Sequence, residues 1–164
     1  MKSRRASRGP RLTFSVQYAV SERDQPTRAR LRKWARAALE HDAQITVRIV
    51  GRAEGKRLNR KFRGKHCATN VLTFVFRDTP PYGGDLALCA PVVAREARDQ
   101  GKSAAAHYAH LVVHGVLHLQ GYDHANDADA RVMERRESQI VTKLGYPDPY
   151  GKDEGGGMRA EGPS

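Results

Sequence analysis

The sequence predicts a single α/β (α+β) domain in which a small mixed β-sheet is covered by helices. Segments that alternate apolar and polar residues are separated by segments with helical spacing, and a helical C-terminal half follows. With 164 residues, 39% of them apolar, the chain is long enough to bury one core, and no internal linker divides it. We expect the domain to span residues 12–150, between a disordered basic tail at 1–11 and a flexible Gly-rich tail at 151–164.

The first part of the domain predicts two strands with a helix between them. The helix opens at Pro26 and Thr27. The strands are indicated by two sets of alternating apolar residues: Leu12, Phe14, Val16 and Tyr18, then Ile45, Val47 and Ile49. The apolar positions of the helix have helical offsets: Leu31, Trp34, Ala35, Ala38 and Leu39.

The middle of the chain predicts a short basic helix at 53–62, with Leu58 and Phe62 as its apolar anchors. A polar connection follows at 63–70. The continuous apolar and β-branched run at 71–76 predicts a strand buried on both faces. A loop rich in Pro and Gly then leads into a short strand at 85–89.

The C-terminal half predicts three helices. Pro91 suits the first position of a helix that runs to about Asp99 and stops at Gly101. Ser103 is the expected cap of a long helix that carries four histidines. Asn126 or Asp127 starts a last helix, which Gly145 ends. Its expected buried positions are Val132, Met133, Ile140, Val141 and Leu144.

The charge balance favours a polyanionic partner. The net charge is +11, of which residues 1–11 contribute +5 and residues 151–164 contribute −1, leaving +7 on the domain. Such an excess is typical of nucleic-acid binding, and also of a merely solvated, Arg-rich surface. No run is long and apolar enough to cross a membrane, and no secretory signal follows the basic start. Cys67 and Cys89 form no paired motif, so we expect a cytoplasmic protein with both thiols buried or half-buried.

Three histidines near the end of the long helix have the spacing of metal ligands. His114 and His118 are four apart and project from one face of a helix, Gly121 lets the helix end, and His124 can return to the same point. Three imidazoles with one open position are typical of catalytic zinc, so we expect one Zn²⁺ per chain, although nickel, copper or iron would suit the same ligands. If Asp123 completed the set of ligands, the site would be structural. The alternative is that Asp123 hydrogen-bonds to a metal ligand or acts as a cap. For the preceding His107 and His110 we expect packing or surface roles.

The same spacing invites comparison with metalloproteases. The metzincin pattern has these His, His, Gly and His offsets, but it places a Glu directly after the first His as the general base. Here Gly115 stands at that position. The metal-binding half of the motif is therefore present, and the base of the protease is missing.

A block of basic residues precedes the apolar run at 71–76. Between positions 48 and 65 only Glu54 is acidic, and this density predicts a track for a phosphate backbone, with a solvated face as the alternative. The basic residues are Arg48, Arg52, Lys56, Arg57, Arg60, Lys61, Arg63 and Lys65. Phe62 and Tyr82 are able to stack on unpaired bases, but packing is their expected role.

These motifs together resemble the YbeY family of bacterial endoribonucleases. The segment from His114 to His124 reads HGVLHLQGYDH, and a second block reads LNRKFRGK at 58–65 and ATNVLTF at 68–74. Gly84-Asp85-Leu86 and Leu144-Gly145-Tyr146 also match, so the resemblance covers roughly residues 12–150. One departure is His66, where the family usually has an acidic residue.

The resemblance implies a metal-dependent endoribonuclease that prefers single-stranded RNA. The implied biological role is maturation of ribosomal RNA, at the 3′ end of 16S rRNA, and ribosome quality control. The implied metal ligands are His114, His118 and His124, and the implied catalytic arginine is Arg63. We expect RNA contacts at Arg60, Lys61 and Lys65, with rRNA precursors, the small ribosomal subunit or ribosomal proteins as partners.

Two other functions are compatible with the residues. The first is a non-catalytic RNA-binding factor for ribosome assembly that holds a structural zinc. The second and more distant one is a metalloprotease, for which Gly115 provides no base and the positive charge is unsuited. Metal-dependent RNA cleavage separates the endoribonuclease from both.

Overall fold

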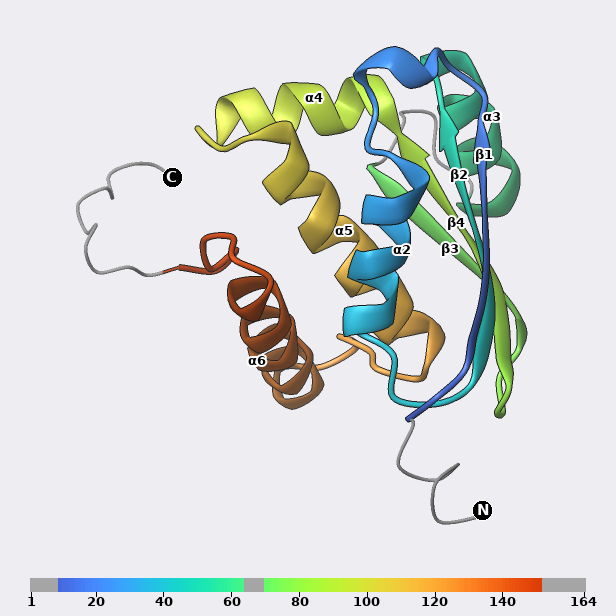
Figure 1. Cartoon of the computed structure of the whole chain (residues 1–164), viewed down its shortest axis with the longest axis vertical. Coiled ribbons are helices and arrows are strands. Elements are labelled where there is room, and N and C mark those ends of the chain that lie inside the picture. Colours follow the sequence, from blue (N-terminus) through green and yellow to red (C-terminus); the bar gives the residue numbers. More distant parts are fainter. Residues whose placement is uncertain (1–8, 64–69, 152–164) are drawn as a thin grey trace.

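The structure is a computed structural model, which describes residues 9–63 and 70–151. Within these residues, four strands form one mixed sheet in the order β1-β2-β4-β3 (Figure 1). β1 (Leu12–Tyr18), β2 (Ala43–Val50) and β4 (Tyr82–Cys89) are parallel, whereas β3 (Val71–Arg77) is antiparallel to β4 at the edge. The α+β class and the mixed sheet are confirmed, and the strand order is new information.

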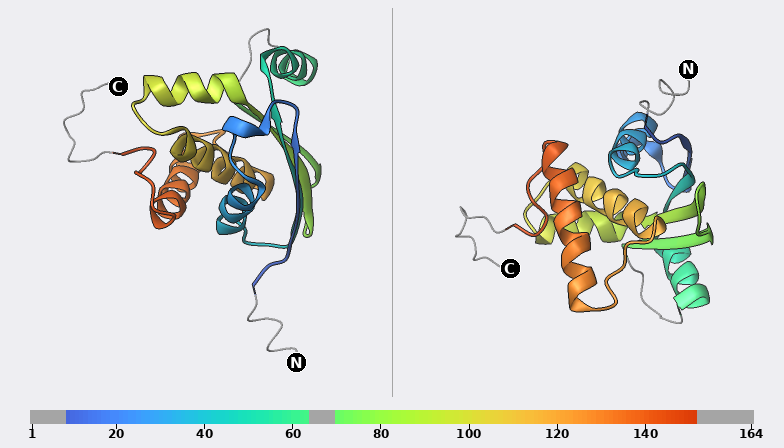
Figure 2. Two further views of the ribbon diagram at one scale, coloured as in Figure 1. Left: turned by 45° about the horizontal axis from the view of Figure 1, so that its top comes forward. Right: turned by 90° about the horizontal axis from the view of Figure 1, so that it is seen from below.

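One face of the sheet carries the main core. Ile45, Val47 and Ile49 of the central strand β2 are at most 1% exposed. Two helices, α2 (Arg28–Ala37) and α5 (Ala104–Leu119), cover this face, as Figures 1 and 2 show. The predicted apolar positions of the first helix are all buried: Leu31, Trp34, Ala35, Ala38 and Leu39.

The predicted helix starts are confirmed by their caps. Thr27 accepts a hydrogen bond from the backbone N–H of Arg30 (3.2 Å), and Ser103 does the same for Ala106 (3.0 Å). Asn126 caps α6 (Asp127–Lys143) by accepting from the N–H of Asp129 (2.8 Å). Each oxygen satisfies a donor that the first helical turn leaves without an intrahelical partner.

The helix ends also follow the predicted positions. Pro91 lies in the first turn of α4 (Ala90–Asp99). Gly101 and Gly145, which follow α4 and α6, have φ values of +67° and +100°, a conformation that glycine adopts without strain. A short 3₁₀ helix, η1 (Glu22–Asp24), precedes α2.

The basic helix predicted at 53–62 is α3 (Arg52–Arg63), and it lies on the sheet face opposite to α2 and α5 (Figure 2). Leu58 is half-buried, and the side chain of Phe62, the second predicted anchor, lies outside the described residues. Cys89 is buried, as expected, whereas Cys67 lies outside the described residues.

The prediction that residues 71–76 are buried on both faces is wrong. Val75 is 42% exposed and Phe76 is 59% exposed. The cause is strand order: β3 has a single neighbour, β4, and the ladder has a β-bulge between Val75 and Arg77. An apolar run alone does not distinguish such an edge strand from a central one.

One expected core position of α6 is also wrong. Met133, Ile140 and Val141 are buried, but Val132 is 50% exposed. The face of α6 that packs on α5 therefore does not include Val132. Leu144 is half-buried.

Among the described residues, no helix has the length and apolar character that a membrane span requires. The predicted tails lie almost wholly outside the described residues, so the domain boundaries stay predictions.

Candidate active site

The three candidate ligands come from the end of α5 and from the loop that follows it. His114 and His118 lie on the last turns of α5. Gly121 has φ +106°, and its N–H donates to the His118 carbonyl (3.0 Å), which closes the helix and reverses the chain. His124 thereby returns to the other two: its ring centre is 5.6 Å from that of His114 and 6.1 Å from that of His118.

Hydrogen bonds fix the tautomers of the two helical histidines. His114 Nδ1 lies 2.6 Å from Glu137 Oε2, and His118 Nδ1 lies 3.0 Å from the carbonyl oxygen of Tyr122. Both partners are acceptors, so each Nδ1 carries a hydrogen, and in the neutral ring each Nε2 keeps its lone pair. A histidine that binds a metal through one nitrogen and donates from the other has this arrangement. The donor chemistry therefore fits a zinc ion held by His114, His118 and His124.

The spacing of the rings is somewhat wider than that of a bound set. In a tetrahedral site with Zn–N bonds of about 2.1 Å, two imidazole centres lie about 5 Å apart. As they stand, no three His, Cys, Asp or Glu side chains in the described part of the chain are arranged to hold an ion. The His124 side chain is 53% exposed on its loop. Zinc binding by this triad stays a prediction.

Glu137 of α6 is a site residue that the sequence analysis missed. It is completely buried and accepts hydrogen bonds from His114 Nδ1, from His110 Nε2 (2.8 Å) and from the Tyr150 hydroxyl. Burial acts to raise the pKa of Glu137, but these donors outweigh it and lower the pKa to about 2. The available signal was a carboxylate on the apolar face of α6, in helical register with Met133 and Ile140.

The ligand loop is tied to residues 38–41, which follow α2, by the buried side chain of Gln120. Its Oε1 accepts from the backbone N–H groups of Glu40 (2.7 Å) and His41 (3.0 Å), and its Nε2 donates to two carbonyls, those of Ala38 and Val116. Three of these four contacts join segments about 80 residues apart, and no local pattern in the sequence signals them.

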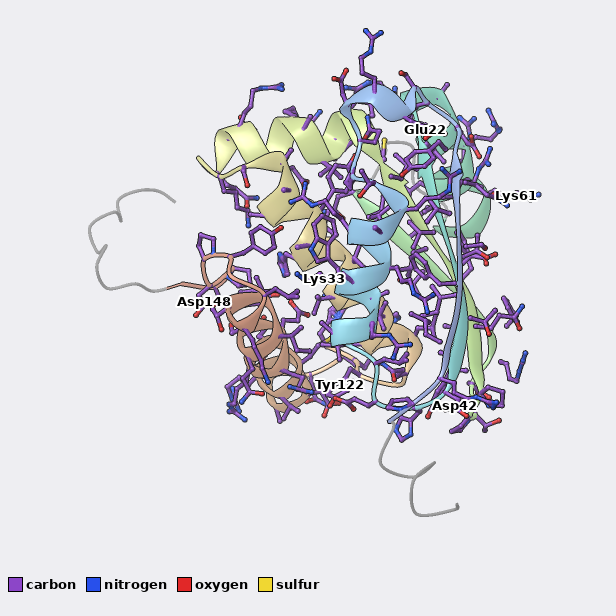
Figure 3. All side chains as sticks on the ribbon, viewed as in Figure 1. Glu22, Lys33, Asp42, Lys61, Tyr122 and Asp148 are labelled. Atoms are coloured by element: carbon purple, nitrogen blue, oxygen red, sulfur yellow. The ribbon has the colours of Figure 1, made fainter. Side chains whose placement is uncertain are left out.

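A second contact to the loop comes from Tyr122, which Figure 3 places between the lower ends of α2 and α6. Its hydroxyl donates to the Glu40 carboxylate (3.0 Å), which also accepts from Arg136 Nε of α6 (2.9 Å). Asp123 is exposed, and its Oδ1 accepts from the backbone N–H of His124 (2.8 Å). The loop that presents His124 is thus held from both sides.

The structure gives Gly115 a packing role. A Cβ at this position would lie 2.7 Å from Cδ2 of Leu86, which is fully buried in β4. Residue 115 therefore faces the sheet, and its hydrogen allows α5 to lie close to β4. A carboxylate there would be buried in the core, so the departure from the protease pattern reflects how this helix packs.

The two earlier histidines of α5 contact carboxylates. His107 is buried, and its Nε2 lies 2.8 Å from Glu96 Oε1 of α4, which also accepts from the Asn70 side chain (2.9 Å). Burial lowers the pKa of His107, which keeps the ring neutral. His107 therefore has the expected packing role, while His110 shares Glu137 with His114 and so supports the candidate site.

The predicted phosphate track maps mainly onto α3. The described residues Arg52, Lys56, Arg57, Arg60 and Lys61 of this helix are exposed, and Lys61 projects outward in Figure 3. Arg48 is different, because its Nε and Nη2 donate to the Glu54 carboxylate (2.7 and 3.1 Å). Arg63 ends α3, but its side chain lies outside the described residues, as do Lys65 and His66.

Comparison with known proteins assigns the family. The family model described as Endoribonuclease YbeY matches residues 17–145. This chain belongs to the YbeY family. The Endoribonuclease YbeY of Nitrosomonas europaea is 58% identical over 139 residues, covering 85% of each chain. That of Nitrosomonas eutropha is 60% identical over 137 residues, covering 84% of this chain and 97% of the relative.

A solved structure supports the fold. The solution structure of TM1509 from Thermotoga maritima matches with a TM-score of 0.58 and 25% identity, covering 86% of this chain and 99% of that one. The YbeY family match includes all three candidate ligands and α3. The resemblance inferred from the sequence motifs is therefore confirmed.

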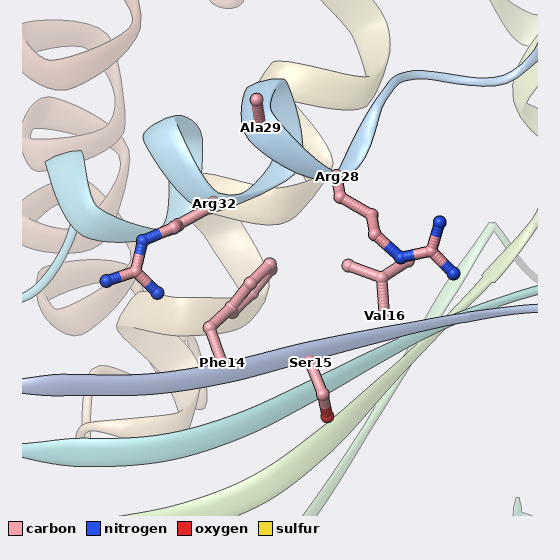
Figure 4. A pocket seen from close by; sticks show the side chains of 6 residues that line it. All are labelled: Phe14, Ser15, Val16, Arg28, Ala29 and Arg32. Carbon is pink, nitrogen blue, oxygen red and sulfur yellow. The ribbon is translucent and has the colours of Figure 1, made fainter.

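A separate groove lies away from the YbeY motifs, between β1 and α2 (Figure 4). It has a volume of about 490 Å³ and is lined by Phe14, Ser15, Val16, Arg28, Ala29 and Arg32. None of the candidate site residues lines it, so we assign it no part in the site.

Proposed function

We propose that this protein is a cytoplasmic, zinc-dependent endoribonuclease that cleaves single-stranded RNA in ribosomal RNA precursors. Its implied role is maturation of the 3′ end of small-subunit rRNA and ribosome quality control, with the small ribosomal subunit or its proteins as partners. The observation that carries the proposal is the geometry of His114 and His118, whose Nδ1 atoms are both engaged so that both Nε2 atoms are available to a metal. Family membership supplies the reaction class.

The chemistry requires a nucleophile and compensation for charge on the phosphoryl oxygens. A zinc ion held by His114, His118 and His124 would supply hydroxide near neutral pH, since its bound water has a pKa of about 7. Glu137 fixes the tautomer and orientation of His114, and the Tyr122 carbonyl does the same for His118. We assign the phosphoryl oxygens to Arg63, because a guanidinium binds two of them in a planar fork.

The substrate class is tested with three probes. We expect internal cuts in a single-stranded RNA that carries the 3′-terminal precursor sequence, and a much slower reaction with the same sequence in a blunt duplex. A peptide library should stay intact. Equal rates on duplex and single strand, or peptide cleavage, would contradict the proposal. Tight RNA binding without metal-dependent cleavage would instead identify a ribosome-assembly factor.

The role of Arg63 is tested by Arg63→Ala. The variant should keep its bound metal and lose turnover by about 100-fold or more, the usual cost of removing one preorganised group that stabilises transition-state charge. Metal analysis and single-turnover RNA cleavage measure the two quantities. Arg32→Ala is the matched control, because Arg32 is exposed on α2 and should leave the rate unchanged. A normal rate in Arg63→Ala would remove Arg63 from this role.

A further inference from the structure

The edge strand β3 carries an exposed aromatic side chain that the site described above does not use. Phe76 is 59% exposed, and it is the extra residue at the β-bulge, since Val75 pairs with Gly84 and Arg77 pairs with Gly83. A bulge re-aims the side chain of the extra residue and is often found next to a functional site. Burial does not explain the position of this ring.

The ring of Phe76 is backed by a glycine and flanked by a cation. A Cβ at residue 83 would clash with Cε1 of the ring, so the ring lies directly against the Gly83 backbone. The Arg77 guanidinium carbon is 5.7 Å from the ring centre. One side of the ring is thus supported while the side chain stays mostly in solvent, with a positive charge beside it.

The ring of Phe76 lies at the β3 edge of the sheet, on the face away from α5, because a Cβ at Gly84 would meet Leu119 of α5 and the neighbouring Gly83, which backs the ring, faces the other side. α3 lies on one face of the sheet, and α5, which packs on β3 and β4, lies on the other (Figures 1 and 2). An RNA strand that contacts both helices has its shorter path over the β3 edge, because β1 is at the far edge.

We propose that Phe76, supported by Gly83 and flanked by Arg77, is a stacking platform for an unpaired base of the RNA substrate. This inference rests on the proposed endoribonuclease function. Aromatic side chains on strands stack on the bases of single-stranded RNA, and every base offers a π-face, so the contact tolerates different sequences. Arg77 provides the charge that attracts the adjoining phosphate.

The test measures binding of single-stranded RNA oligomers that carry 2-aminopurine, whose fluorescence falls when the base stacks. Binding is measured in a His114→Ala background, so that the RNA stays intact. Phe76→Leu should weaken the Kd by roughly 5- to 100-fold and abolish the fluorescence decrease, whereas Phe76→Tyr should retain both. Val75→Thr is the matched control, because Val75 is an exposed apolar neighbour on the same strand. This variant should bind RNA normally.

The outcomes separate this inference from the proposed function. If the protein with native Phe76 cleaves single-stranded RNA but Phe76→Leu keeps the same Kd and fluorescence change, the stacking inference is wrong and the function stands. If Phe76→Leu loses only the binding of a ribosomal protein, β3 is a protein-docking edge and the inference is again wrong. If the native chain neither binds nor cleaves single-stranded RNA, both fail.

Discussion

At the residue scale, the candidate metal centre depends on Glu137. This single buried carboxylate accepts hydrogen bonds from two histidines and a tyrosine, and one of the histidines is a candidate metal ligand. A buried carboxylate is stable only when such donors compensate for its lost hydration. Glu137 therefore links the stability of the α5–α6 packing to the orientation of His114.

The pH dependence of stability tests this role of Glu137. Its pKa in the folded protein is about 2, below the ordinary value of 4.5, so its charged form stabilises the fold above about pH 4.5. That contribution should be lost as the pH falls from about 4.5 towards 2. Urea unfolding of metal-free protein across this range should show a smaller loss in Glu137→Gln than in wild type. Glu22→Gln, at an exposed ion pair, is the control and should follow wild type. Identical slopes for wild type and Glu137→Gln would rule out the role.

At the scale of elements, the loop after α5 is positioned by contacts to residues 38–41, which follow α2. The Gln120 side chain bonds four backbone groups, three of which belong to residues 38–41. Because these bonds hold the start of the ligand loop, they also fix where His124 enters the site. The loop is short, but its geometry is determined by a distant segment of the chain.

Replacing Gln120 by Ala should destabilise the fold and weaken metal binding. The variant leaves the part-buried backbone donors of Glu40 and His41 without their acceptor, which costs about 1–3 kcal/mol in the free energy of unfolding. Urea denaturation measures this cost, and competition with a chelator measures the zinc affinity. An unchanged zinc affinity together with a normal free energy of unfolding would show that the hydrogen bonds of Gln120 do not position the loop.

The close packing of α5 on β4 gives a second prediction for these elements. Gly115→Ala should gain up to about 1 kcal/mol of helix propensity but lose about 1–3 kcal/mol through overpacking against Leu86. We expect a net loss of stability, measured by urea unfolding. Adding Leu86→Ala should remove the clash, so the two changes should be strongly non-additive. Stabilisation by Gly115→Ala alone would show that residue 115 has room.

The elements predicted correctly are those whose signals are local. Thr27, Ser103 and Asn126 each bond a backbone group three residues away, so their caps are legible in the sequence. The burial of β3 could not be predicted from the sequence, because it depends on which strand becomes the edge of the sheet. Glu137 and Gln120 were missed because their partners are about 25 and 80 residues away. The histidine spacing was predictable because one helix and one glycine turn hold all three residues.

At the scale of the whole molecule, the exposed basic residues of α3 and the candidate metal centre lie on different sides of the sheet (Figure 2). The exposed basic residues of α3 are on one face, and α5 with His114 and His118 is on the other (Figure 2). Asn70, directly before β3, bonds Glu96, which in turn contacts His107 of α5. These contacts link the start of the edge strand to the histidine helix.

The most direct test of a three-histidine centre for RNA hydrolysis combines metal analysis with mapping of RNA product ends. Wild type, His114→Ala and His118→Ala would be assayed in the same preparations, with circular dichroism to verify the fold. We predict about one zinc per chain and defined internal cuts for wild type. Both variants should lose metal and cleavage together while staying folded. Undiminished cleavage by a rigorously metal-free wild-type preparation would contradict the central claim.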